Sequence, residues 1–259
     1  MVHTLNMVRL SVVPDDRRER RRDARRQRYL GAASRIIDRD GLGGVTMQAI
    51  ADELDCAIGT IYTYFPSKSA LLSALTQQGI ETLRASYVTG CHLWDAELER
   101  DDLEPDLVAL VRLLAFAAFF GAASIVFADE FALQRALLGG GADEDGASPD
   151  AHRPRASLEV VLALLEAPRL AVVAATDAGA LHPGDALERS LRWMASLNAV
   201  LMLDRLAPLD RHLFRAAHQA RALTADLLVG WGAARDQVEV AAGLVDRLAA
   251  LGPMAPPPD

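Results

Sequence analysis

Cysteine is scarce in this sequence, with only two residues, Cys56 and Cys91, among 259. Two thiols are too few for the disulfide framework of a small secreted domain, so we expect a reducing compartment. Alternating runs of valine, isoleucine and threonine are almost missing, whereas alanine and leucine dominate. Because strands need such alternation and alanine and leucine favour helices, the composition predicts an all-α chain.

Targeting and membrane signals are also weak. The opening residues, MVHTLNMVRLSVVPDD, lack a sustained apolar stretch and a small-residue cleavage site, so we expect no signal peptide. The longest apolar run, residues 107–128, is interrupted by Arg112. A membrane-spanning helix and a buried core helix both fit this run, but the part after Arg112 is shorter than the roughly 20 residues a span needs. We therefore expect a core helix, no membrane contact and a cytoplasmic protein.

Residue constellations that carry chemistry are missing as well. The six histidines form no metal-ligand pattern, and no glycine-rich phosphate loop follows a predicted strand. No serine lies in the setting of a nucleophile elbow, and residues 139–154 lack the ligand spacing of a calcium loop. We expect no enzymatic activity, no metal and no cofactor, and we predict a flexible acidic loop over residues 139–154.

Negative charge dominates the chain, whose formal net charge is −8. The first 90 residues nevertheless carry 13 Lys and Arg against 10 Asp and Glu, whereas the remainder carries 14 against 25. A positive N-terminal part on an otherwise negative chain indicates an anionic partner at the N-terminal end. The alternative is a solvated tail with local ion pairs. We expect residues 1–22 to be a disordered basic arm. Its charge belongs to a run of eight arginines: Arg17, Arg18, Arg20, Arg21, Arg22, Arg25, Arg26 and Arg28.

Helical periodicity begins after this arm. Residues 23–40 place Leu30 and Ile37 on one face, which predicts a first helix. Thr46 is a suitable N-cap, so a short second helix is predicted over residues 47–54. Both helices belong to a predicted small domain.

A very short turn at Asp55 leads into another short helix, predicted over residues 57–64. Pro66 ends that helix, and Ser67 caps a long one from residue 68 to about residue 100. Two short helices joined by such a turn describe a helix-turn-helix, whose second helix lies in the DNA major groove. The sequence therefore predicts a three-helix DNA-binding domain over residues 23–75.

The second short helix has an unusual surface. Its inner side and the preceding helix supply an apolar seam: Ile50, Leu54, Cys56, Ile61 and Phe65. The remaining side chains are uncharged and rich in hydroxyls: Ile58, Gly59, Thr60, Tyr62, Thr63 and Tyr64. Tyr and Thr hydroxyls bond phosphate oxygens, and a Thr methyl can meet a thymine methyl. Ser67 and Lys68, at the start of the long helix, add backbone amides and the only lysine, which favours a phosphate-binding role.

Two stretches carry a family resemblance: T-M-x-x-I-A at residues 46–51 and G-T-I-Y-x-Y-F-x-S-K-x-x-L-L at residues 59–72. With them, residues 25–75 resemble the DNA-binding domain of the tetracycline-repressor (TetR) family of bacterial transcription regulators. The resemblance covers about fifty of the 259 residues. It implies that Gln48 and residues 60–63 lie nearest the bases. The full set of DNA contacts that it implies is Thr46, Gln48, Thr60, Tyr62, Tyr64 and Lys68.

Three positions depart from the family pattern. Asp55 replaces the usual turn glycine, but Asp tolerates the left-handed conformation better than most residues, so we expect the turn to survive. Ala57 cannot cap the second helix, at a cost of about 1 kcal/mol. Ile58 can offer a base only a methyl contact. Because the motif carries little positive charge, we infer that the arginine run reaches a neighbouring groove or the DNA backbone.

The resemblance implies a C-terminal ligand-binding and dimerisation domain, placed over residues 76–251, and residues 252–259 are expected to be a disordered tail. Helices are predicted near residues 105–138, 155–180, 184–206, 209–231 and 235–251. Aromatic and adaptable side chains with a few polar groups favour an apolar ligand pocket, although a packed core uses the same mixture. The candidate ligand residues are Trp94, Arg112, Phe116, Phe119, Phe120, Phe127, Phe131, Trp193, Asn198 and Met202.

Residues 191–206 are too apolar to face water on all sides, and residues 216–232 are rich in small side chains. Such helices allow the close approach of a four-helix interface between two copies. Together with these helices, the family resemblance implies a homodimeric repressor on an inverted-repeat operator, released by a small, largely apolar ligand. A regulator with a vestigial pocket or an activating role, and a non-specific DNA-coating protein driven by the arginine arm, are the alternatives.

Overall fold

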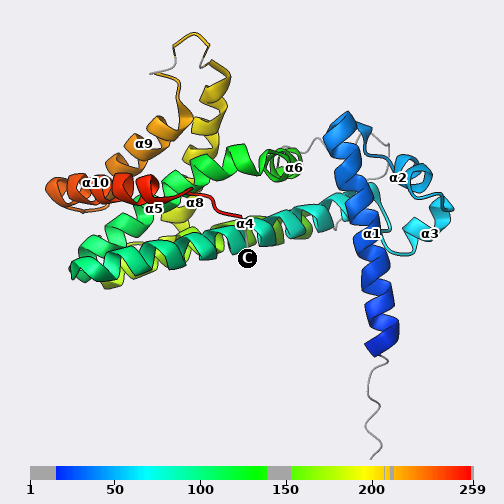
Figure 1. Cartoon of the computed structure of the whole chain (residues 1–259), viewed down its shortest axis with the longest axis horizontal. Helices are drawn as coiled ribbons and strands as arrows, with labels where there is room; N and C mark the ends of the chain where they lie inside the picture. The colour runs from blue at the N-terminus through cyan, green and yellow to red at the C-terminus, as the bar shows by residue number, and fades with distance from the viewer. Residues whose placement is uncertain (1–15, 139–152, 207, 211–212, 258–259) are drawn as a thin grey trace, which may run out of the picture. The chain divides into compact units, whose positions relative to one another are not determined.

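The computed structural model describes residues 16–138, 153–206, 208–210 and 213–257. All regular elements in these ranges are helices, so the all-α prediction is confirmed (Figure 1). The chain divides into two compact units, one ending at Leu71 and one starting at Leu72. They are called the N-terminal and the C-terminal unit below.

The N-terminal unit holds the predicted helix-turn-helix. Its first helix packs on the motif through the expected face, because Leu30 and Ile37 are both buried. Ile36 and Val45 are fully buried beside them and complete a small apolar core. The elements of this unit are α1 (Asp16–Asp40), the short 3-10 helix η1 (Leu42–Gly44), α2 (Met47–Glu53), α3 (Ile58–Tyr62) and the start of α4 (Lys68–Leu98).

The start of α1 differs from the prediction. The helix begins at Asp16, so residues 16–22 are helical, although the arm was expected to be disordered. Arginine is a good helix former, and Glu19 and Asp23 each stand three residues before an arginine, a spacing that supports a helix. Apolar periodicity could not reveal this part of the helix because its side chains from residue 17 onward are exposed. Residues 1–15 of the arm lie outside the described residues.

The C-terminal unit is built around one apolar helix. This helix, α5 (Pro105–Val126), contacts every later α-helix of the chain within the described residues. It is long and apolar enough to cross a membrane, yet 67% of its most apolar 18 residues are buried inside the protein. Its neighbours are η2 (Glu99–Asp101), α6 (Ala128–Leu138), α7 (Arg153–Asp177), α8 (Ala186–Leu201), η3 (Met202–Leu206), α9 (Ala216–Gly230) and α10 (Arg235–Leu251).

Two helix boundaries in this unit were predicted wrongly. The helix expected over residues 105–138 breaks at Phe127, whose backbone leaves the helical region at φ −115° and ψ 49°. The carboxylates Asp129 and Glu130 then stand in the first turn of α6, where the helix dipole favours them. The helix expected from residue 209 starts only at Ala216. The acidic loop predicted over residues 139–154 lies outside the described residues as far as residue 152.

The C-terminal tail is ordered as far as Pro257, against the prediction of a disordered segment. Met254 and Ala255 are buried, and the fully buried hydroxyl of Ser86 donates a hydrogen bond to the carbonyl of Pro256 at 2.5 Å. The prolines exclude a helix, as expected, but they do not exclude a segment that buries a methionine and accepts a hydrogen bond from Ser86 of α4. Residues 258 and 259 lie outside the described residues.

We expect deletion of residues 253–259 to destabilise the C-terminal unit. The truncation removes Met254 from the core and takes the acceptor away from Ser86, which together should cost about 2 kcal/mol. The melting temperature, followed by circular dichroism, should fall by roughly 4–8 °C. Deletion of residues 257–259 alone is the control and should leave it unchanged. Equal melting temperatures for all three chains would contradict a structural role for the tail.

Candidate functional site

The turn between α2 and α3 is held by close packing and by backbone hydrogen bonds. Ile50 and Ala51 of α2 are buried, and Ile61 of α3 is fully buried. The amide of Cys56 donates to the carbonyl of Ala51 at 3.0 Å. Asp55 adopts the left-handed conformation with φ 48°, as expected for the residue that replaces the turn glycine.

A carboxylate of α2 ties the motif to α1. Glu53 accepts hydrogen bonds from Arg35 Nε and Arg39 Nη1, each at 3.1 Å. Hydrogen bonds from these two guanidinium groups hold the pKa of Glu53 below its usual range. The pair is open to solvent, so it orients α2 on α1 more than it stabilises the unit.

The outer surface of α3 is uncharged and accessible. Tyr62 is 46% exposed, and Gly59 and Thr63 are exposed beside it. Thr63 Oγ1 donates to the carbonyl of Thr60 at 2.6 Å, which leaves its lone pairs free to accept. Ile58 is half-buried, and no side chain caps this helix at Ala57.

Tyr64 has a structural role. It is half-buried, and its ring lies 5.2 Å from the ring of Tyr29 on α1. Phe65, which is buried, contacts the same tyrosine edge-on at 6.5 Å. The guanidinium of Arg26 lies 5.4 Å from the Phe65 ring centroid, a cation–π geometry. Tyr64 and Arg26 therefore help to hold α1 against the motif.

The predicted capping residues occupy their helix starts. Thr46 Oγ1 accepts from the Ala49 amide at 2.9 Å, and Ser67 Oγ accepts from the Ala70 amide at 3.1 Å. Lys68, half-buried, follows at the first position of the 31-residue helix α4. Gln48 Nε2 donates to Asp52 Oδ1 at 2.7 Å, so its amide carbonyl remains available on an exposed surface. An anion is favoured at the start of α4 by the helix dipole and by the lysine.

The arginine run lies along the exposed first turns of α1. All eight arginines are exposed and belong to the same unit as α3. Their spacing distributes them around the helix rather than on one face, so several directions of approach present positive charge. This surface is available to a polyanion.

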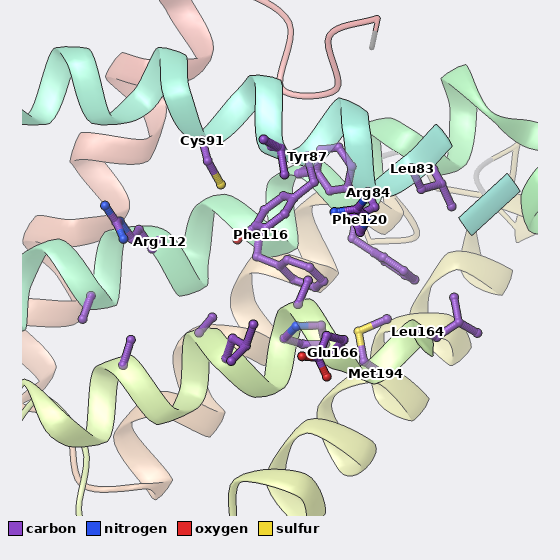
Figure 2. Close-up of a pocket in the computed structure, with 18 of the residues that line it drawn as sticks. Leu83, Arg84, Tyr87, Cys91, Arg112, Phe116, Phe120, Leu164, Glu166 and Met194 are labelled. Carbon is purple, nitrogen blue, oxygen red and sulfur yellow. The ribbon is translucent and has the colours of Figure 1, made fainter. Parts of the chain in front are cut away.

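A second candidate site is a cavity of about 900 Å³ inside the C-terminal unit. Its walls come mainly from α4, α5, α6 and α7, with Met194 of α8 and the loop residues Leu103 and Ala178. Figure 2 shows Tyr87 and Cys91 on α4 facing Phe116 of α5, and Glu166 and Met194 on the opposite side. Burial is the main cause that raises the pKa of Tyr87 and the pKa of Cys91, so both side chains are uncharged at neutral pH.

Half of the sequence-predicted ligand residues line this cavity: Arg112, Phe116, Phe119, Phe120 and Phe131. Trp94 and Phe127 do not line it. Trp193 is buried in the core, where its indole N–H donates to Thr224 Oγ1 at 2.9 Å. Asn198 donates to the carbonyl of Met194 at 2.9 Å, and Met202 is exposed on the surface. Large apolar side chains mark core and cavity alike, so their sequence pattern could not separate the two.

Other cavity residues were missed from the sequence. Tyr87 and Cys91 lie one turn apart on α4, and their spacing of four residues was the available signal. Gln134 of α6 also lines the cavity and is only 6% exposed. The alanines that α7 contributes, such as Ala167 and Ala171, carry no sequence signal for a ligand site.

Comparisons with known proteins agree with this geometry. The profile of the family described as "Bacterial regulatory proteins, tetR family" matches residues 30–75. The HTH-type transcriptional repressor KstR of Mycobacterium tuberculosis is 49% identical over 55 residues, 21% of this chain and 25% of the repressor. KstR of Rhodococcus jostii is 42% identical over 65 residues, 25% of this chain and 31% of that protein. The chain thus spans less than a third of each curated relative that it matches.

Solved structures resemble the fold over most of the chain. A protein of unknown function from Rhodococcus sp. RHA1 has a TM-score of 0.53 and 21% identity, covering 80% of this chain and 94% of its own. The complex of RolR with resorcinol has a TM-score of 0.51 and 16% identity, covering 86% and 95%.

The motif and the all-helical fold define a helix-turn-helix protein of the class that binds DNA. Residues 30–75 of the N-terminal unit match the helix-turn-helix domain of the tetR family of bacterial regulatory proteins.

We expect the left-handed turn at Asp55 to limit the stability of the motif. Asp55→Gly should preserve or slightly stabilise it, whereas Asp55→Val should destabilise it by about 1–2 kcal/mol, because a β-branched residue is strained at φ 48°. Hydrogen exchange of the α2 and α3 amides measures the effect. Asp102→Val, at the other left-handed aspartate (φ 47°), is the control and should leave those amides protected. Unchanged exchange in Asp55→Val would contradict the strain argument.

Proposed function

We propose that this protein is a cytoplasmic, non-enzymatic, homodimeric repressor of transcription. It binds an inverted-repeat operator and leaves the DNA when a small, largely apolar ligand enters the cavity of the C-terminal unit. The observation that carries the proposal is the α2–α3 motif, whose uncharged hydroxyl-rich surface lies within residues 30–75, the part that matches the tetR family. A footprint on the operator, with and without ligand, is the direct test.

In this proposal the motif divides its contacts between bases and phosphates. Gln48 and residues 60–63 approach the bases, where the free Gln carbonyl and the Thr groups can read an edge. The Tyr64 hydroxyl and Lys68 hold phosphate oxygens, aided by the amides at the start of α4. The exposed arginines of α1 add sequence-independent attraction to the backbone.

Dimerisation is proposed through α8 and its neighbour α9. The outer face of α8 exposes Leu187, Leu191, Ala195 and Ala199 at helical spacing, and Met202 at the start of η3 continues this stripe. Leu187 is 43% exposed and Leu191 is 49% exposed, which is costly for leucines that face water. Small alanines in the stripe permit close helix approach, and a two-fold interface would match an inverted-repeat operator.

Helix α4 provides the proposed link between ligand and DNA. It begins with Lys68 in the N-terminal unit and lines the cavity with side chains from Ile80 to Cys91 in the C-terminal unit. A ligand can release DNA only if it binds more tightly to a conformation in which the recognition helices no longer fit the operator. A change at the cavity wall that tilts or shifts α4 would produce such a conformation.

A second function, a protein that coats DNA without sequence preference, is favoured by one observation. All eight arginines of the run are exposed on α1. Binding that falls steeply with salt but is equal on operator and unrelated DNA would favour this function over repression.

We expect Lys68→Ala to weaken operator binding about equally on all operator variants, because a phosphate contact carries no sequence information. The slope of log affinity against log salt should fall by about one unit. Tyr64→Phe should weaken binding without changing this slope. Arg100→Ala, at an exposed arginine beyond the end of α4, is the control and should bind normally. Wild-type affinity for Lys68→Ala would refute the phosphate assignment.

We expect Leu191→Glu to separate the dimer, because a charge in the apolar stripe of α8 cannot be buried without a partner. Light scattering after size-exclusion chromatography should show a monomer, and operator affinity should fall at least tenfold because each half-site is then bound alone. Val240→Glu, at a valine of α10 that is 54% exposed, is the matched control and should remain dimeric. A dimeric Leu191→Glu would place the interface elsewhere.

A further inference from the structure

Gln134 has a buried amide nitrogen without a hydrogen-bond partner. The residue lies on α6, lines the cavity and is 6% exposed. Its Nε2 is the only buried side-chain nitrogen or oxygen left unpaired in the described parts of the chain. A buried N–H without a partner is unfavourable, so such a group calls for a partner that is present in the working state.

The charged groups around the cavity are already compensated. Each has an ion-pair partner: Arg84 with Glu81 at 2.9 Å, Arg112 with Asp95 at 2.8 Å, and Glu166 with Arg169 at 3.5 Å. Tyr87 and Cys91 are protonated, because burial raises the pKa of each. The cavity therefore offers no unpaired charge to a ligand, which disfavours an anionic or cationic guest.

The apolar wall of the cavity is a chain of aromatic rings. Tyr87 and Phe116 have centroids 5.2 Å apart, Phe116 and Phe120 are stacked at 6.3 Å, and Phe120 meets Phe131 edge-on at 5.0 Å. Phe131 stands one helical turn before Gln134, so both face the same side of α6. The unpaired amide thus lies at one end of an aromatic wall.

We propose that Gln134 is the polar anchor of the cavity and that its Nε2 donates a hydrogen bond to a carbonyl oxygen of an uncharged, ring-containing ligand. The apolar body of this ligand lies against Phe116, Phe120 and Phe131. The inference rests on the proposed function only in taking this ligand as the effector that releases DNA. It adds the ligand class: neutral, with an aromatic or other ring body and an oxygen acceptor at the α6 end.

Three probes with the same two-ring body test this assignment by calorimetric titration of the full chain. Benzophenone carries a neutral carbonyl, diphenylmethane lacks any acceptor, and diphenylacetate carries a charge. Wild-type protein should bind benzophenone about 3- to 10-fold more tightly than diphenylmethane, the range of one net hydrogen bond, and should bind diphenylacetate more weakly than benzophenone. Gln134→Met should abolish the benzophenone advantage while leaving diphenylmethane within about twofold. Met194→Leu changes the cavity wall without touching a polar group, so it should keep the advantage.

The melting temperature of the ligand-free protein gives an independent readout. Replacing an unpaired buried amide by a methionine of similar size should raise it or leave it unchanged, whereas loss of a satisfied core amide would lower it. A lowered melting temperature in Gln134→Met would therefore overturn the anchor.

Equal binding of benzophenone and diphenylmethane by the wild type would also overturn the anchor, and so would a preference for diphenylacetate or no binding of any probe. None of these results alters the operator footprint, which tests repression separately.

Discussion

The C-terminal unit depends on one constraint: α5 is apolar on nearly all sides, so neighbouring helices must bury most of its surface. Twelve of its 22 residues are buried, including the run from Leu113 to Ala117. A Cβ added to Gly121 would lie 3.6 Å from the Cα atom of Ala217 on α9, so these two helices approach closely. Toward α4 its side chains are phenylalanines, which meet Tyr87 ring to ring. The cavity lies on the phenylalanine side of α5, next to α4.

The N-terminal unit also buries its apolar side chains between helices, with a smaller core. Ile50 and Ala51 of α2 and Ile61 of α3 are buried between the two short helices. Asp55 makes the sharp turn that brings these helices together. What remains outside on α3 is an uncharged row of hydroxyl and aromatic groups. Attraction to a polyanion is then left to the arginines of α1 and to Lys68, so the proposed reading of bases and holding of phosphates involve different residues.

The roles of Gln134 and of the C-terminal tail depend on their surroundings in the folded chain. An amide at position 134 is ordinary in a helical sequence, but burial without a partner makes it a candidate anchor. A proline-rich tail is commonly solvated, yet here it covers Ser86 and adds Met254 to the core. In both cases the residues that surround the group are far away in the sequence.

The sequence alone determined the helical class, the helix-turn-helix, its caps at Thr46 and Ser67, and the resemblance of residues 25–75 to the TetR family, because all of these depend on local spacing. It also located the aromatic half of the cavity wall on α5 and α6. The tertiary structure decided which rings line the cavity and which fill the core, since Phe116 and Trp193 have the same local signature. It alone showed Tyr87, Cys91 and Gln134 at the cavity, the early start of α1 and the buried tail, because each depends on which distant segments pack, or fail to pack, against it.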